Sequence, residues 1–164
     1  MEKILNVTQY VFDEYKRVSG EIVDEMKLHK LLYFVQRESI AILGVPMFEE
    51  PFEGWKYGPV SRIVRFSYTP DGIYDDNLKD ISDDAKYIVN NVIAQYGAIA
   101  SWKLSDISHK EISWLNARKG IERGENGSVE LKIEDIMEDA KKVRPYDTIW
   151  DMFYDEFEDI EVVE

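Results

Sequence analysis

Residues 24–44 read DEMKLHKLLYFVQRESIAILG, and this stretch determines how the rest of the chain can be arranged. Asp24 can accept a hydrogen bond from a backbone N–H at the start of a helix, and Gly44 can end that helix in the left-handed conformation. The apolar side chains between them fall on two faces. One face carries Leu28, Leu31, Leu32, Val35 and Ile42, and the other carries Tyr33, Gln36 and Ile40. A helix with two apolar faces is typically surrounded by other elements, so we expect it at the centre of its domain.

Apolar residues at helical spacing predict further helices on both sides of the central one. One runs from Val7 to about Val18, with Asn6 as its cap, and another runs from a cap at Ser82 to Gly97. The remaining helices are shorter. They are expected after Pro59, over residues 102–107, after a capping box of Ser108 and Glu111, and over residues 133–140.

The segment from Val45 to Tyr57 is rich in proline, glycine and aromatic residues. Its two prolines disfavour a helix. We expect a strand over residues 52–57 that pairs with residues 47–49 and is broken by Gly58-Pro59. Residues 69–72, Thr-Pro-Asp-Gly, predict a turn. The predicted fold is therefore mainly α, a single-domain helical bundle with a small β-hairpin around residues 47–57.

Composition narrows the class of protein. The chain has 164 residues, the usual size of one domain, and no cysteine, which excludes disulfides, thiol nucleophiles and cysteine-bound zinc. Neither a signal peptide nor a membrane span is predicted, so we expect a cytoplasmic protein with no membrane partner. The net charge of −13 disfavours direct binding of nucleic acid, because phosphates would be repelled.

The acidity is concentrated at the C-terminal end. Residues 146–164 contain eight acidic residues and no Lys or Arg, together with Trp150, Phe153 and Phe157 at helical spacing. We therefore divide the chain into a domain at 1–145 and an acidic aromatic tail at 146–164. Such a tail needs a surface for its aromatic side chains, either the body of this protein or a partner; we expect docking on the body.

Few side chains suggest catalysis. The two histidines, His29 and His109, have no companion at metal-ligand spacing, and a histidine at a helix start, such as His109, is usually a capping or surface residue. The chain has no G-x-S-x-G, P-loop or dinucleotide-binding motif. We expect no catalytic residue, no metal and no cofactor, and therefore not an enzyme.

Three blocks of sequence resemble the Panacea domain family, also called the SocA-like antitoxin domain. The first is MKLHKLLYFVQ at 26–36, and the second combines GVPMF at 44–48 with FEGWKYGPV at 52–60. The third combines Tyr96-Gly97, Leu104-Ser105, His109 and Trp114. The resemblance covers roughly residues 5–120. It departs at Gly54, where we expect alanine, and at Ser113, where we expect proline.

The resemblance implies an antitoxin that neutralises a cognate protein toxin by direct binding, the toxin being encoded by an adjacent gene. Some family members are phage-associated proteins, which suggests a prophage or another mobile element as the source. One line of the family delivers its toxin to a protease as an adaptor. The residues that we expect to bind the partner are Tyr33, Gln36, Trp55, Tyr57, Gly58, Pro59, His109 and Trp114.

Other functions stay open at this point. An acidic phage regulator or DNA mimic would use the acidic tail to occupy a basic nucleic-acid site. A hydrolase is disfavoured because no nucleophile, ligand cluster or phosphate loop is present. Residues 52–59 also have a purely structural interpretation. In it, the side chains of Phe52, Trp55 and Tyr57 pack the hairpin against the helices.

Overall fold

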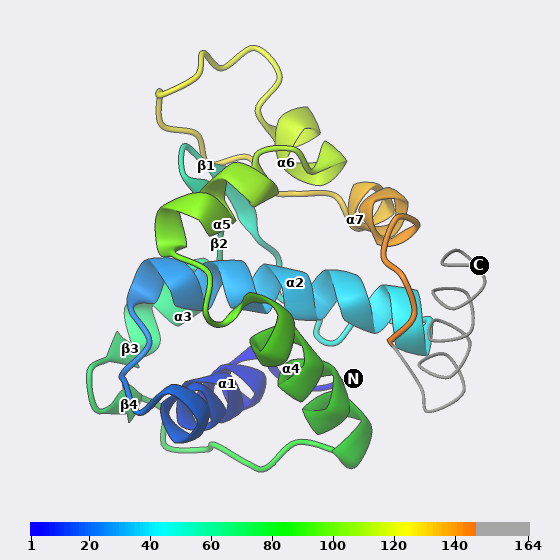
Figure 1. Ribbon diagram of the computed structural model, residues 1–164. Coiled ribbons are helices and arrows are strands. Elements are labelled where there is room, and N and C mark those ends of the chain that lie inside the picture. The colour runs from blue at the N-terminus through cyan, green and yellow to red at the C-terminus, as the bar shows by residue number, and fades with distance from the viewer. Residues whose placement is uncertain (147–164) are drawn as a thin grey trace, which may run out of the picture.

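The central position of the second helix is confirmed. The computed structural model describes residues 1–146, and Figure 1 shows α2 (Glu25–Leu43) crossing the middle of the molecule. Every residue from Lys27 to Ser39 is buried, so the helix is covered on all sides. Leu32 is fully buried in this core.

Six other helices surround α2 within residues 1–146. Two long ones, α1 (Ile4–Ser19) and α4 (Asp83–Tyr96), cover one side, and α5 (Ser101–Ser108) packs on α2 from another. The shorter helices are α3 (Arg62–Ser67), α6 (Ile112–Ala117) and α7 (Ile133–Ala140). The mainly α fold class is thus confirmed. None of the helices in this part of the chain is long and apolar enough to cross a bilayer.

The predicted boundaries of α2 and α4 are confirmed by their caps. Asp24 Oδ1 accepts a hydrogen bond from the Lys27 N–H at 2.8 Å, and Gly44 has φ of 78°. At α4 the Ser82 hydroxyl accepts from the Ala85 N–H at 3.2 Å.

Two predicted caps are wrong, because a distant backbone N–H uses the side chain of Asn6 and a local carbonyl uses that of Ser108. Asn6 lies inside α1 and accepts a hydrogen bond from the Lys79 N–H at 2.9 Å. Ser108 ends α5, where its hydroxyl donates to the Ser105 carbonyl. The start of α6 is capped instead by Asp139 of α7, whose Oδ1 accepts from the Ile112 N–H at 2.7 Å.

The predicted hairpin is present, but its second strand lies on the other side of the turn. Strand β1 (Glu53–Trp55) pairs antiparallel with β2 (Gly58–Val60), so Gly58 and Pro59 continue the hairpin instead of breaking it. The outer edge of β1 is held by a distant segment: the Gly54 N–H donates to the Val129 carbonyl and the Leu131 N–H donates to the Phe52 carbonyl, both at 2.8 Å.

A second, smaller hairpin was not expected. Strands β3 (Tyr68–Thr69) and β4 (Gly72–Ile73) pair around the turn that the sequence predicted at 69–72. The Ile73 N–H donates to the Gln9 side chain at 2.8 Å, so this hairpin is attached to α1. The helical spacing expected in the acidic tail falls on residues 147–164, outside the described residues.

Candidate partner-binding surface

Six of the eight predicted partner-binding residues come together between the β1–β2 hairpin and the junction of α5 and α6. We call this set the hairpin surface: Trp55, Tyr57, Gly58, Pro59, His109 and Trp114. The Trp114 indole N–H donates to the Trp55 carbonyl at 2.7 Å, which fixes α6 to the hairpin. His109 stacks on Trp114, with ring centroids 4.2 Å apart.

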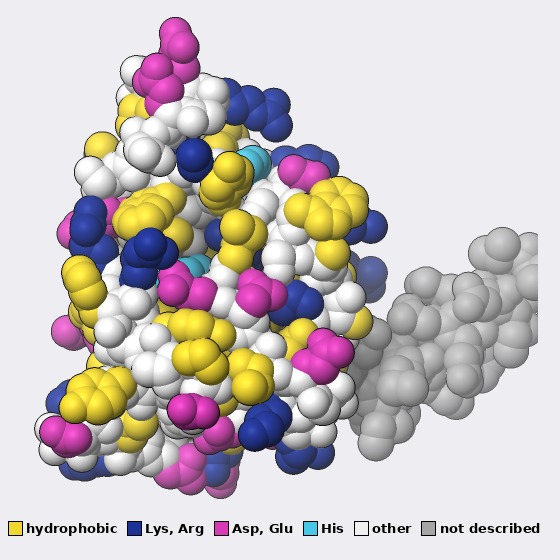
Figure 2. Space-filling model, turned by 90° about the vertical axis from the view of Figure 1, so that its left-hand side faces the viewer, with side chains coloured by type: hydrophobic (Ala, Val, Ile, Leu, Met, Phe, Trp, Pro, Cys, Tyr) yellow, Lys and Arg dark blue, Asp and Glu magenta, His cyan; other side chains and the backbone are white. Residues whose placement is uncertain are grey.

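These six residues differ in exposure. Tyr57 is 54% exposed and Trp55 is half-buried, while Trp114, Gly58 and Pro59 are buried. The accessible part of the hairpin surface is therefore aromatic. Figure 2 shows the face that carries it, on which hydrophobic side chains are interspersed with Lys and Arg and also with Asp and Glu, and histidine is visible between them.

Gly58 allows the hairpin to approach the helices closely. Its φ is 123°, in the region that favours glycine. A Cβ atom at this position would lie 2.6 Å from the Ser108 Oγ and 2.7 Å from the Lys30 Cε. Only glycine fits, and the close approach brings Lys30 of α2 under the hairpin.

Lys30 lies at the base of a pocket of about 450 Å³ beside the hairpin surface. We call it the lysine pocket; its lining includes Met26, Lys30, Trp55, Tyr57, Val60 and Arg65. Lys30 as a residue is 1% exposed, and within residues 1–146 its amine forms no hydrogen bond or ion pair, although the Nζ atom itself is not fully enclosed and faces the pocket. Burial lowers the pKa of this amine to about 8, against the opposing effect of the Asp24 charge.

The two histidines near this surface differ in whether their ring nitrogens have hydrogen-bond partners. His29 is partnered on both sides: its Nδ1 accepts from the Ser61 N–H and its Nε2 lies 3.2 Å from Glu25. Both ring nitrogens of His109 are buried without a partner in the described residues. Burial, and then the Lys30 charge, lower the pKa of His109, so its ring is neutral at pH 7.

Cations surround the aromatic side chains of this face, although the whole chain is acidic. The guanidinium of Arg65 lies 5.2 Å from the Trp55 ring centre, and that of Arg118 lies 5.2 Å from the Trp114 ring centre. The Lys56 amine lies 5.0 Å from the Tyr57 ring centre. Aromatic rings and cationic groups therefore lie side by side on this face.

The other two predicted residues, Tyr33 and Gln36, lie inside the fold. Gln36 Oε1 accepts from the Met47 N–H at 2.7 Å and its Nε2 donates to the Phe48 carbonyl at 2.8 Å, which fixes the chain that leads to the hairpin. Neither side chain lines the hairpin surface. Both hold the elements that carry it.

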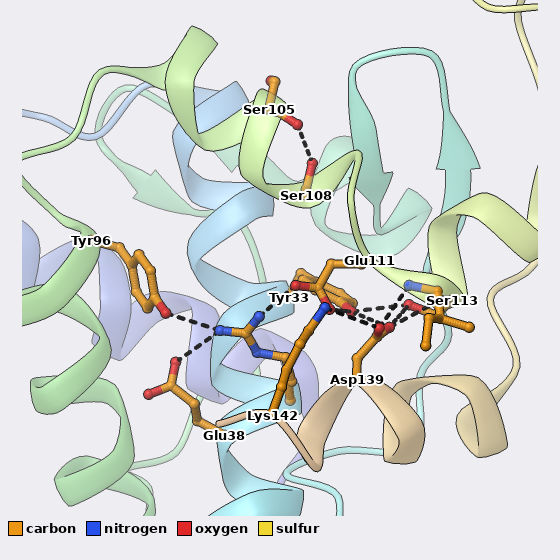
Figure 3. Close-up of polar contacts among 11 residues, drawn as sticks. Tyr33, Glu38, Tyr96, Ser105, Ser108, Glu111, Ser113, Asp139 and Lys142 are labelled. Atoms are coloured by element: carbon orange, nitrogen blue, oxygen red, sulfur yellow. Dashed lines mark hydrogen bonds and ion pairs between the residues drawn. The ribbon is translucent and has the colours of Figure 1, made fainter. Parts of the chain in front are cut away.

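Tyr33 belongs to a buried polar cluster, the carboxylate network, made of Tyr33, Arg37, Glu111, Ser113 and Asp139 (Figure 3). The Tyr33 hydroxyl lies within 3.1 Å of Glu111, Ser113 and Asp139. Arg37 pairs with Glu111 at 2.5 Å. The network therefore joins α2 to the start of α6 and to α7.

The pKa values of the two carboxyl groups of the network are shifted in opposite directions. Burial raises the pKa of Glu111. Burial also acts to raise the pKa of Asp139, but hydrogen bonds from Ser113 and from the Ile112 N–H outweigh it and lower that pKa. Asp139 is thus the charged cap of α6. Across residues 1–146, no three His, Asp or Glu side chains are arranged to hold a metal ion.

The two departures from the family pattern lie in tight contacts. A Cβ at Gly54 would lie 3.1 Å from the Ala117 Cβ, closer than usual packing. At Ser113, both the N–H and the hydroxyl donate to Asp139, at 3.0 and 2.7 Å. Proline there would lack the N–H. Both residues therefore act in the interior, not on the hairpin surface.

Sequence reasoning missed Lys30, Ser108 and Arg118. Arg118 donates to the Gly54 carbonyl at 3.0 Å and to two carbonyls of the loop after α6, so it holds that loop against the hairpin. For Lys30 a signal was present: a lysine lies among the apolar residues of a helix predicted to be buried on two faces.

Comparison with known proteins gives one match. The model of a family described as "Antitoxin SocA-like, Panacea domain" matches residues 28–115, just over half of the chain, from α2 to α6. No curated protein and no solved structure matches. The matched range contains the whole hairpin surface and Lys30.

Proposed function

The chain belongs to the family of SocA-like antitoxins with the Panacea domain, and we propose that it neutralises a cognate protein toxin by binding it directly through the hairpin surface. The observation that carries this proposal is that the hairpin with the accessible Trp55 and Tyr57 is joined to the stacked pair of His109 and Trp114 through the bond from the Trp114 indole N–H to the Trp55 carbonyl. Aromatic side chains give large contact areas at small entropic cost and often dominate protein interfaces.

We propose that the toxin is encoded beside this chain, on a prophage or another mobile element, and that both proteins act in the cytoplasm. The function needs no catalytic residue, metal or cofactor of this chain. The network around Tyr33 and the contacts of Gln36 support the surface from inside.

The test is to co-express the chain with each small open reading frame beside its gene. One of them should stop growth when expressed alone, and co-expression should restore growth. The purified pair should form a stable complex. If no neighbouring product is toxic, or if the toxic product does not bind, the proposal is wrong.

The surface is tested by the double variant Trp55→Ala/Tyr57→Ala. Toxin affinity should fall at least about tenfold, which corresponds to roughly 1.4 kcal/mol. The control is Tyr74→Ala, because Tyr74 is 76% exposed but follows β4, which packs on α1. Equal loss in both variants would argue against the hairpin surface.

The protease-adaptor alternative predicts a different result in the same cells. Direct neutralisation leaves the toxin present in a complex, so its half-life is unchanged or longer when the antitoxin is present. An adaptor shortens that half-life, and deletion of the responsible protease then abolishes neutralisation.

We also propose that residues 146–164 form an acidic aromatic tail whose start docks on domain 1–145. The Tyr146 hydroxyl donates to the buried Glu38 at 2.9 Å, and its ring lies edge-on to Tyr87. Truncation after Pro145 should lower the melting temperature more than truncation after Tyr146. If both truncations leave melting unchanged but abolish neutralisation, the tail contacts the partner. A DNA-mimic role would appear as competition between the tail and DNA for that partner.

A further inference from the structure

The lysine pocket contains the amine of Lys30, which forms no direct ion pair within residues 1–146, although the charge of Asp24 acts on it. Glu25 is the only acidic residue in its lining, and its carboxylate is already engaged by Arg65 at 2.9 Å and by His29 at 3.2 Å. The amine of Lys30 has no partner within residues 1–146. A buried charge without a partner destabilises a fold unless something else offsets it.

A second buried lysine on the same helix, Lys27, differs from Lys30 because its amine has a hydrogen-bond acceptor within the fold. Lys27 lies one turn earlier on α2 and is 8% exposed. Its amine donates to the Gly97 carbonyl at 2.8 Å and lies 5.4 Å from the Tyr15 ring centre. Lys30 has no such acceptor within residues 1–146, so its amine is available to a group that enters the pocket.

The walls of the pocket are apolar, and its rim is basic. Met26, Trp55, Tyr57 and Val60 form much of the lining, and the amine of Lys56 lies over the Tyr57 ring. The volume of about 450 Å³ has room for one or two side chains. A ligand that fits must therefore carry a negative group on an apolar stem.

We propose that the lysine pocket receives an acidic side chain, flanked by apolar residues, from the bound protein partner, and that its carboxylate pairs with Lys30. This proposal rests on the function proposed above and names the chemistry of the partner. One ammonium matches the single charge of a carboxylate, and the apolar lining suits a carboxylate on an apolar stem better than a free phosphate, although Arg65, whose Nη1 pairs with Glu25, and Lys56 also line the pocket.

Gly58 makes this contact possible. The tip of Lys30 lies against the Cα side of Gly58, where any Cβ would approach its Cε within 2.7 Å. A side chain at position 58 would push the amine away from its place under the hairpin. Gly58 therefore determines where the Lys30 amine lies in the pocket.

The test uses 3-phenylpropionate, which carries a carboxylate on an aromatic stem, and its neutral amide as matched probes. Binding is followed by NMR chemical shifts of the full chain. The acid should bind saturably and at least tenfold more tightly than the amide, with shifts centred on Trp55, Tyr57 and Lys30. In Lys30→Met the preference for the acid should disappear, while the melting temperature stays equal or rises. Lys56→Met, a change at the rim, should reduce acid binding by less.

Several results would overturn the proposal: equal binding of acid and amide, acid binding unchanged in Lys30→Met, or no saturable binding of either probe. Inorganic phosphate bound more tightly than the acid, and lost in Lys30→Met, would also overturn it in favour of a phosphate site. The outcome is separate from the proposed function, since a chain that neutralises its toxin equally well with Met at position 30 keeps that function and loses only this inference.

Discussion

Two regions along α2 bury polar side chains in opposite ways. In the carboxylate network the Tyr33 hydroxyl and the Asp139 carboxylate each have several partners, and of the Arg37 nitrogens only Nε lacks one among the described residues. In the lysine pocket and the adjoining hairpin surface, the Lys30 amine and both nitrogens of His109 have none there. Native folds satisfy most buried polar groups, so the fold itself explains most of the first region, whereas the Lys30 amine and the His109 ring are the groups through which we propose that the second region meets a partner.

The largest effect on stability is expected from a substitution that disrupts the carboxylate network. Asp139→Ala removes the cap of α6 and leaves the Ser113 hydroxyl and the Ile112 N–H without their acceptor. We expect the free energy of unfolding to fall by about 3–5 kcal/mol, measured by urea denaturation. Glu134→Ala, an exposed acidic residue on the same helix, is the control and should change it by less than about 0.5 kcal/mol. A small loss for Asp139→Ala would mean that the network does not hold α6.

The burial of Lys30 in the lysine pocket should make the free energy of unfolding depend on pH. The pKa of Lys30 falls from 10.5 to about 8 on folding, so the unfolded chain binds more protons between these values and wild-type stability rises with pH there. Lys30→Met should be more stable than wild type at pH 7 by at most roughly 3 kcal/mol. That advantage should shrink as the pH rises from 8 to 10.5. Urea denaturation at several pH values measures it; a difference independent of pH would refute burial of a charged amine.

The two buried lysines sharpen the comparison. Lys27→Met leaves the Gly97 carbonyl without its donor and should cost about 1–3 kcal/mol of stability at pH 7. Lys30→Met removes no bond within the described residues and should not destabilise. Thermal melts of the two variants side by side test this, and equal destabilisation would contradict the distinction between them.

The smallest effect on stability is expected at the accessible edge of the hairpin surface. Tyr57 is more than half exposed, so Tyr57→Ala should change the free energy of unfolding by less than about 0.5 kcal/mol. Toxin binding by the same variant should nevertheless weaken. If melting fell strongly while binding stayed constant, Tyr57 would be a structural residue.

The sequence predicted those parts of the fold that depend on local patterns. The double apolar stripe placed α2 at the centre, and Asp24 and Gly44 gave its ends. Pairings that the local sequence pattern does not show caused the misses. Gly58-Pro59 has the pattern of a strand break, but the pair begins β2, where Gly58 lies opposite Trp55 and Pro59 lies opposite Gly54. The cap of α6 comes from Asp139, which no local pattern around Ser108 could reveal.

For the candidate site too, the sequence could indicate residues that belong to local patterns but not those whose role depends on distant contacts. Aromatic residues that resemble family blocks could be selected from sequence, and six of the eight meet at one surface. Sequence could not separate Lys27 from Lys30, since both are lysines on the buried helix. The difference is the Gly97 carbonyl, supplied by a residue 70 positions away from Lys27.

The way in which the outer edge of β1 is held has a consequence for synthesis on the ribosome. Residues 129 and 131 bond to this edge, and Asp139 then fixes α6, which carries Trp114. Trp55 and Tyr57 therefore leave the ribosome long before the residues that hold them in position. Because a domain folds only when its contacts have been synthesised, a nascent chain released before residue 139 lacks a finished surface. Under the function proposed above, prematurely terminated chains would not compete for the partner with chains that contain residue 139.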